Sequence, residues 1–253
     1  MPQDIVTPLL LAAAGFAAGT INSIAGGGSL LTLPLLIFVG LPATVANATN
    51  RIAILVGGVG ATHSFVRHAL IPYHWLGFVL PPAFVGVALG TWGAATIGDV
   101  AFERILAVVL VLAAIWIVWR PVRVGAGGDV PDPPVGRKGW VLRVAFFGLG
   151  LYSGFIQAGL GFLFLALFSS QGFDLIRANA LKVPLVLAFT AFALLLFAFT
   201  GLLDWGAGLS LAAGQFFGAK LGVHLQVLKG QTWVRNVLTV AILAFAIRLL
   251  VGG

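Results

Sequence analysis

The chain contains uncharged apolar runs that are far longer than the core helices of soluble proteins require. No charged residue occurs between Ile5 and Asn50, and none occurs between Val144 and Phe173. About 20 apolar residues already cross a lipid bilayer. Charged residues make up only 8% of the chain, whereas soluble domains carry about a quarter. The sequence therefore predicts a polytopic membrane protein. Its spans are expected to be helices, because lipid leaves backbone polar groups no outside partner.

The apolar pattern predicts eight full spans and two shorter segments. Each of the two shorter segments follows a cluster of glycines. The run 144–173 would be about 45 Å long as one straight helix, against about 30 Å of hydrocarbon. A helix that breaks at glycine and continues as a half-helix or re-entrant segment fits this length best. The predicted spans are residues 5–23, 43–66, 75–97, 101–119, 141–159, 176–199, 206–227 and 231–251, and the shorter segments are 28–39 and 161–170.

The two halves of the chain repeat one pattern of small and polar residues. The register that pairs Asn179 with Asn47 also aligns glycines farther along the chain. The glycine clusters align in a different register, which pairs Gly161 with Gly26. The predicted fold is all-α, with two homologous four-helix repeats, about eight spans in all, each with a first helix broken at glycine. Duplicated spans that are interrupted at matching positions indicate a transporter's binding site.

A segment rich in proline, glycine and charge, residues 122–138, separates the halves. The expected division is a repeat over residues 1–121, this linker, and a repeat over residues 139–253, which together form one transport domain. By the positive-inside rule, the basic residues of the linker predict a cytoplasmic position. Four spans per half would also place both termini in the cytoplasm, although Lys229 and Arg235 would then lie outside. If the broken segment crosses twice, each half has five spans and the repeats are inverted; the sequence leaves this choice open.

Polar side chains occur deep inside two of the predicted spans. Asn47, Asn50 and Arg51 share one helix face, because they lie at positions i, i+3 and i+4. Asn179 and Lys182 repeat the first two of these positions. A charge inside a membrane span is costly and indicates a functional site; snorkelling to the interface is the alternative. No acidic residue lies nearby in the sequence, so a substrate anion is the expected counter-ion.

The glycine-rich breaks are expected to line the same cavity as these polar side chains. Consecutive glycines weaken a helix by about 1 kcal/mol each relative to alanine, and the amides they free need cover from protein or a cavity. Close helix packing is the alternative, and it is favoured for the glycines spaced by four, Gly15, Gly19, Gly86, Gly90, Gly218 and Gly222. The predicted binding residues are Asn22, Ser23, Gly26, Gly27, Gly28, Asn47, Asn50, Arg51, Gln157, Asn179 and Lys182, and a gating or proton role is assigned to His63, Lys220 and His224.

At these residues the chain resembles the TauE/SafE family of sulfite exporters. The resemblance rests on GTINSIAGGGSLLTLPLL and ATVANATN in the first half, and on GLYSGFIQAGLGF, RANALK and GQFFGAKLG in the second. Membership implies a carrier in the bacterial inner membrane that exports a small sulfur-containing anion, such as sulfite or an organosulfonate. The second half has GLGF where a fuller glycine cluster is expected, so its break is predicted to be milder.

The predicted function is secondary transport of a small anion by alternating access at the repeat interface. An anion channel using the same cations, or a carrier of another small anion such as a carboxylate, is the alternative. No nucleophile–base pair and no metal-ligand set occurs at depth, so neither enzyme activity nor a metal or cofactor is expected. The net charge of +7 is assigned to membrane topology rather than to nucleic acid. The expected partners are the lipid bilayer and the sulfur anion, and a homodimer is left open.

Overall fold

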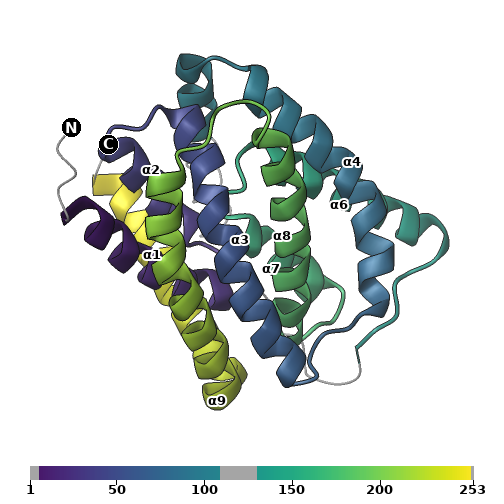
Figure 1. Ribbon diagram of the computed structural model, residues 1–253. Coiled ribbons are helices and arrows are strands. Elements are labelled where there is room, and N and C mark those ends of the chain that lie inside the picture. Colours follow the sequence, from purple (N-terminus) through teal and green to yellow (C-terminus); the bar gives the residue numbers. More distant parts are fainter. Residues whose placement is uncertain (1–5, 109–129, 252–253) are drawn as a thin grey trace.

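The computed structural model describes residues 6–108 and 130–251, and all regular secondary structure in these two ranges is helical (Figure 1). Helices α1, α4 and α8 are long and apolar enough to cross a membrane. The elements of the first half are α1 (Val6–Ile24), α2 (Ser29–Phe38), α3 (Ala43–Arg67) and α4 (His74–Thr96), followed by a helical stretch over 99–108. Those of the second half are α6 (Gly136–Phe155), α7 (Leu160–Ser170), α8 (Leu175–Phe197) and α9 (Trp205–Val251).

These elements confirm the predicted helices within a few residues. The predicted separation near residue 230 is also present, because Gly230 has non-helical dihedral angles and divides α9 into two parts. The end of the predicted span 101–119 and most of the linker lie outside the described residues. The last three linker residues are helical, since α6 begins at Gly136.

Both first helices are broken, and the second break is not the milder one. Between α1 and α2, Gly26 has a φ of 85°. Between α6 and α7, both Gln157 and Gly159 have positive φ, 64° and 70°. A side-chain-bearing residue rarely adopts this conformation, so the second break contains more unusual backbone than the first. The prediction was wrong because it counted glycines, whereas Gln157 takes the left-handed conformation without being one.

The helix ends also correct the predicted register of the glycine clusters. The last residues of α1 and α6, Ile24 and Phe155, are as far apart in the sequence as the first residues of α2 and α7. The same register pairs Gly26 with Gln157, and both have positive φ. The predicted pairing of Gly26 with Gly161 was therefore wrong. The starts of α3 and α8 differ from this register by a single position, so almost one register relates the two halves throughout.

Contacts between helices recur in pairs in this register. A Cβ atom on Gly218 of α9 would lie 2.0 Å from the carbonyl oxygen of Phe16, and one on Gly86 of α4 would lie 2.2 Å from that of Phe147. The pairs α1–α9 and α4–α6 thus pack backbone to backbone. The packing role predicted for the glycines spaced by four is confirmed, because each would place a Cβ atom 2.0 to 2.6 Å from a main-chain oxygen of its neighbour: Gly15, Gly19, Gly86, Gly90, Gly218 and Gly222.

Helices α1, α3 and the first part of α9 run in the same direction. Along the contacts between two of these helices, the residue numbers rise together in both. In an antiparallel pair, the numbers would rise along one helix while they fall along the other. The contacts are those of Gly15 with Leu211, Gly19 with Gln215, Gly208 with Ile52 and Gly57 with Gln215.

Helices α3 and α8, the equivalent helices of the two halves, run in opposite directions. Gly58 approaches Leu187, whereas the earlier residue Arg51 lies against the later residue Phe197. In Figure 1 the two helices lie beside each other near the centre of the molecule. The halves are therefore inverted relative to each other. Within the described ranges each half has five helical segments, counting the two parts of α9 separately, and these correspond to the four predicted spans and the one shorter segment.

The linker lies at the end of α3 and not at its start. Trp75 Nε1, at the beginning of α4, donates to the carbonyl of Pro131 at 2.7 Å. At the opposite end, the backbone N–H and the hydroxyl of Thr44 donate to Asp99 at 3.0 and 2.6 Å. Since α1 runs parallel to α3, it begins at the Asp99 end. The expectation that the linker and both termini share one side was therefore wrong for the start of α1, at Val6.

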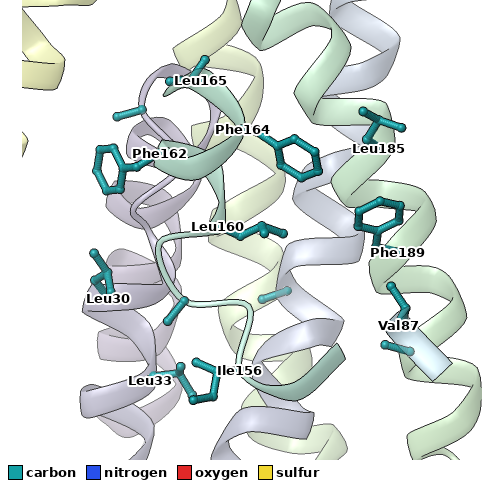
Figure 2. Packing of buried hydrophobic residues seen from close by; sticks show 14 of the residues in the cluster. Leu30, Leu33, Val87, Ile156, Leu160, Phe162, Phe164, Leu165, Leu185 and Phe189 are labelled. Carbon is teal, nitrogen blue, oxygen red and sulfur yellow. The ribbon is translucent and has the colours of Figure 1, made fainter. Parts of the chain in front are cut away.

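Apolar side chains fill the space around the second break. Figure 2 shows Ile156 on the connection into α7 and Leu160 at the start of α7, with Phe164 directed towards Phe189 of α8. The centroids of these two rings are 5.9 Å apart, and both side chains are fully buried. This packing holds α7 against α8 and fixes the position of the break.

Candidate functional site

The first break is held by two polar side chains of α8. Asn179 Nδ2 donates to the carbonyl of Ile24, the last residue of α1, at 2.8 Å. Lys182 Nζ donates to the carbonyl of Asn22 at 3.0 Å and to Asn179 Oδ1 at 2.6 Å. The last carbonyls of a helix lack partners within it and carry partial negative charge. An amide and a cation from α8 therefore complete the end of α1.

The second break is held in the same way by α3. Asn47 Nδ2 donates to the carbonyl of Phe155, the last residue of α6, at 2.9 Å. Arg51 Nη2 donates to the carbonyl of Gly154 at 2.6 Å and Arg51 Nη1 to Gln157 Oε1 at 2.8 Å. The guanidinium also lies 5.1 Å from the ring centroid of Phe197, within the range of a cation–π contact. The partial negative charge beside Arg51 and Lys182 therefore comes largely from main-chain carbonyls, whereas the sequence analysis expected a substrate anion to supply it.

A cavity of about 50 Å³ lies beside the first break. Its walls come from α1, α3, α8, the first part of α9, the starts of α2 and α7, and the two breaks. A liquid water occupies about 30 Å³, so the space suits a small ion or a few waters. Among the described residues, Lys182 is the one charged residue in the lining, and the polar residues are Asn22, Ser23, Ser29, Gln157, Lys182 and Gln215.

The two halves of the molecule differ at this cavity. Gly57 and Gly58 of α3 are among its lining residues. In the register of the repeats, the equivalent residues of α8 are Phe189 and Thr190, both fully buried. Two side chains thus fill on one side the space that two glycines leave open on the other. Arg51 is not among the residues that line the cavity.

The predicted binding residues separate into a lining group and a supporting group. Asn22, Ser23, Gly26, Gln157 and Lys182 line the cavity. The others support the breaks and the helices around them: Asn47, Arg51 and Asn179 at the helix ends, Asn50 through a bond from Thr32 at 2.7 Å, Gly28 through its N–H to Asn22 Oδ1 at 2.8 Å, and Gly27 against the Phe162 ring. Arg51 and Lys182 were expected to face each other across one site, but each is bonded to a different break.

The three residues assigned a gating or proton role lie away from the cavity. His63, Lys220 and His224 are exposed, and none of them is among the lining residues. The ammonium of Lys220 lies 4.7 Å from the ring centroid of Phe216, its neighbour one turn away on α9. Their gating or proton role therefore remains a prediction.

Two lining residues, Ser29 and Gln215, were not singled out from the sequence. Gln215 is 2% exposed and lies in the middle of the first part of α9. An amide at the centre of an apolar span is itself a signal, because uncharged polar groups in lipid also need partners. That signal was available at Gln215, but the sequence prediction used only the glycines that follow it, Gly218 and Gly222.

The acidic residues nearest these helices lie at helix ends. Asp174 accepts from the backbone N–H groups of Ile176 and Arg177 at the start of α8, both at 2.9 Å. Asp204 accepts from the N–H of Ala207 at the start of α9, at 2.9 Å. Within residues 6–108 and 130–251, neither Arg51 nor Lys182 has a carboxylate within 4.0 Å.

Sequence comparison identifies the family. The profile described as "Sulfite exporter TauE/SafE" matches residues 11–249. The chain belongs to the TauE/SafE family. No solved structure matches the chain.

Several relatives are similar over nearly their whole length. A "Probable membrane transporter protein" of Haemophilus influenzae is 30% identical over 241 residues, which cover 94% of this chain and 93% of that protein. A "Probable membrane transporter protein ORF9" of Sinorhizobium is 34% identical over 256 residues, covering 98% and 95%. The Escherichia coli protein YfcA, also a "Probable membrane transporter protein", is 30% identical over 253 residues, covering 97% and 91%. This TauE/SafE chain is thus a multi-pass membrane protein of a transporter family, and its relatives are named as transporters, not enzymes.

Proposed function

We propose that this TauE/SafE protein is a secondary transporter that exports a small sulfur-containing anion, sulfite or an organosulfonate, across the bacterial inner membrane. The observation that carries the proposal is the cavity at the first break, in which Lys182 is the one charged lining residue among those that the structure describes. Lys182 is 2% exposed and has no carboxylate partner among the described residues.

Lys182 is proposed to bind the anion directly. An ammonium has three N–H donors, and two of them serve the Asn22 carbonyl and Asn179 Oδ1. The third donor is left for a ligand in the cavity that the side chain lines. A charge-assisted hydrogen bond is about twice as strong as a neutral one. The amides of Asn22, Gln157 and Gln215 would surround the remaining oxygens of the anion.

Alternating access is proposed to occur between the inverted repeats, residues 1–121 and 139–253. Inverted repeats that rock about a central binding site are a common design of secondary transporters. The two breaks touch at this centre, where a Cβ atom on Gly26 would lie 2.2 Å from Gly161 Cα. The sequence has no ATP-binding motif, so an ion or substrate gradient would drive transport.

The positions along α3 support an inward-open cavity. Its lining residues on α3, from Ile54 to Ala61, lie beyond Arg51 towards the end of the helix near the linker. The basic linker is assigned to the cytoplasm. A cavity displaced to that side would take up its anion from the cytoplasm, as export requires.

The proposed topology places the start of α1, at Val6, and the end of α9, at Val251, outside the cytoplasm. With the linker cytoplasmic, α1 begins on the opposite side, and α9 runs towards the linker side until Gly230 and then turns back (Figure 1). Lys229 then lies on the cytoplasmic side, which removes the conflict with the positive-inside rule that the four-span topology created. The chain contains no cysteine, so single cysteines can be placed freely. Thr7→Cys should react with an impermeant maleimide from outside intact cells and Arg137→Cys should not; the reverse pattern would contradict this topology.

Efflux from proteoliposomes tests the function. Lys182→Met should lower the apparent affinity for sulfite tenfold to a hundredfold, the equivalent of about 1.5–3 kcal/mol for a hydrogen bond to a charged group. Lys138→Met is the matched control, because it removes an exposed lysine outside the cavity. Unchanged efflux and affinity in Lys182→Met would exclude the site, and sustained single-channel currents in planar bilayers would exclude a carrier.

A further inference from the structure

Gln215 combines burial, a position in the cavity wall and an unused hydrogen-bond acceptor. Its side chain is 2% exposed and lines the cavity beside Lys182. Its Oε1 atom is buried and has no hydrogen-bond partner among the described residues. A buried acceptor without a partner costs about 1–3 kcal/mol. Such a cost is reasonable at a site where a ligand supplies the missing donor.

Close contacts on both sides fix where Gln215 lies. A Cβ atom on Gly19 of α1 would lie 2.4 Å from the carbonyl oxygen of Gln215, and one on Gly57 of α3 would lie 2.7 Å from its Cγ. Any larger residue at position 57 would displace the side chain. Two glycines therefore leave the space that this amide needs at the cavity.

The equivalent positions on α4 and α8 lack this arrangement. In the register of the repeats, Ala83 is equivalent to Gln215 and Phe189 is equivalent to Gly57. Both Ala83 and Phe189 are fully buried. The large amide and the glycine at the cavity thus correspond to an alanine and a phenylalanine at the equivalent positions. Ala83 provides no side-chain acceptor at its position.

We infer that Gln215 determines the specificity of the site, by accepting a hydrogen bond from a hydroxyl group of the anion. The inference rests on the proposed function of the cavity. One ammonium balances one negative charge, and one free acceptor requires one donor on the ligand. The preferred ligand is therefore a singly charged oxyanion that keeps one proton, rather than a fully deprotonated anion or an anion with a methyl group in place of the hydroxyl.

Two probes of similar shape and equal charge test whether the hydroxyl group contributes to binding. Hydrogen sulfite and methanesulfinate both carry one negative charge, and the second has a methyl group where the first has a hydroxyl. Binding is measured by calorimetry on the purified full chain at mildly acidic pH, where sulfite is mostly singly protonated. Wild-type protein should bind hydrogen sulfite roughly tenfold more tightly than methanesulfinate, the equivalent of one hydrogen bond at about 1.4 kcal/mol.

The variant Gln215→Met keeps the length of the side chain and removes the acceptor. It should bind hydrogen sulfite roughly tenfold more weakly and methanesulfinate with unchanged affinity. Gln226→Met is the matched control: Gln226 is a buried glutamine of the same helix, donates to the carbonyl of Ser23 at 3.3 Å and does not line the cavity. It should leave the ratio of the two affinities unchanged.

Each other outcome overturns the inference in a recognisable way. Equal weakening of both probes by Gln215→Met would make Gln215 a donor to the anion and not a reader of its hydroxyl. No effect on either probe would remove Gln215 from the site, while a loss of binding in Lys182→Met would still support the proposed function. If Gln215→Met unfolds, Gly57→Ala, which displaces the same amide, should lower the ratio of affinities; an unchanged ratio there would overturn the inference as well.

Discussion

The two helix breaks share one plan of support but differ in what surrounds the cation. At each break an asparagine and a cation from one helix complete the end of another, Asn179 with Lys182 on α1 and Asn47 with Arg51 on α6. Arg51 is also enclosed by the ring of Phe197 and bonded to Gln157. Lys182 instead borders the cavity.

We propose that this difference separates support from binding. A duplicated scaffold needs two helix ends completed, and both halves provide for this. Binding one small ligand needs an opening on one side, and the glycines of α3 provide it where α8 has Phe189 and Thr190. The comparison can be tested by changing equivalent residues in both halves.

The largest effect is expected where the halves are most alike. Gly218→Ala and Gly86→Ala would each place a methyl group 2.0 to 2.2 Å from a carbonyl oxygen of the neighbouring helix. Each should lower the free energy of unfolding by about 3 kcal/mol, because the helices must move apart. Thermal unfolding in detergent measures this. Gly148→Ala is the control, since nothing lies within 4 Å of its Cβ position, and it should be neutral or stabilising by up to about 1 kcal/mol. A large effect in one glycine of the pair alone would contradict the equivalence of α4 and α9.

A smaller, unequal effect is expected for the two cations. Arg51→Met would leave the Gly154 carbonyl and Gln157 Oε1 buried without their donor, and should cost about 2–3 kcal/mol of stability. Lys182→Met should cost only about 1 kcal/mol, because water in the cavity can reach the acceptors it leaves. Sulfite affinity should show the opposite order. Measuring both quantities on both variants tests the division, and a larger stability loss in Lys182→Met would reverse it.

The smallest effect is expected to be equal in the two halves. Asn47→Ala and Asn179→Ala each remove one hydrogen bond to the last carbonyl of a broken helix, at 2.9 and 2.8 Å. Each should cost about 1 kcal/mol, a typical value for a polar contact between membrane helices. Unfolding by denaturant at matched detergent concentration gives the comparison. Costs that differ by more than about 1 kcal/mol would show that the two asparagines are not equivalent.

The helices and their breaks could be predicted from the sequence to within a few residues. The length of an apolar run decides where a membrane helix can form, and that length is a property of one continuous stretch of sequence. The packing role of the glycines spaced by four could also be predicted, since small residues at one helix face permit close approach. The second break was misjudged because the left-handed conformation of Gln157 depends on bonds to Arg51 and Thr190, on other helices.

The candidate site could be predicted in part. Lys182, Asn22 and Gln157 were expected at the cavity and line it, whereas Arg51 was expected there and supports a helix end instead. Both cations looked alike in the sequence, because each follows an asparagine inside an apolar span. Which of them borders open space depends on the size of residues far away in the chain, such as Phe197 beside Arg51.

By itself, the sequence determined that this protein is a helical membrane protein of duplicated design. Composition and apolar length decide whether a segment enters the bilayer, and this does not depend on contacts with other segments of the chain. Only the tertiary structure decided the register and the inverted relation of the halves, since both depend on which helices contact each other and in which direction they run. It also decided the place of the cavity. A cavity is the space that side chains from several helices fail to fill, and no single segment of the chain contains that information.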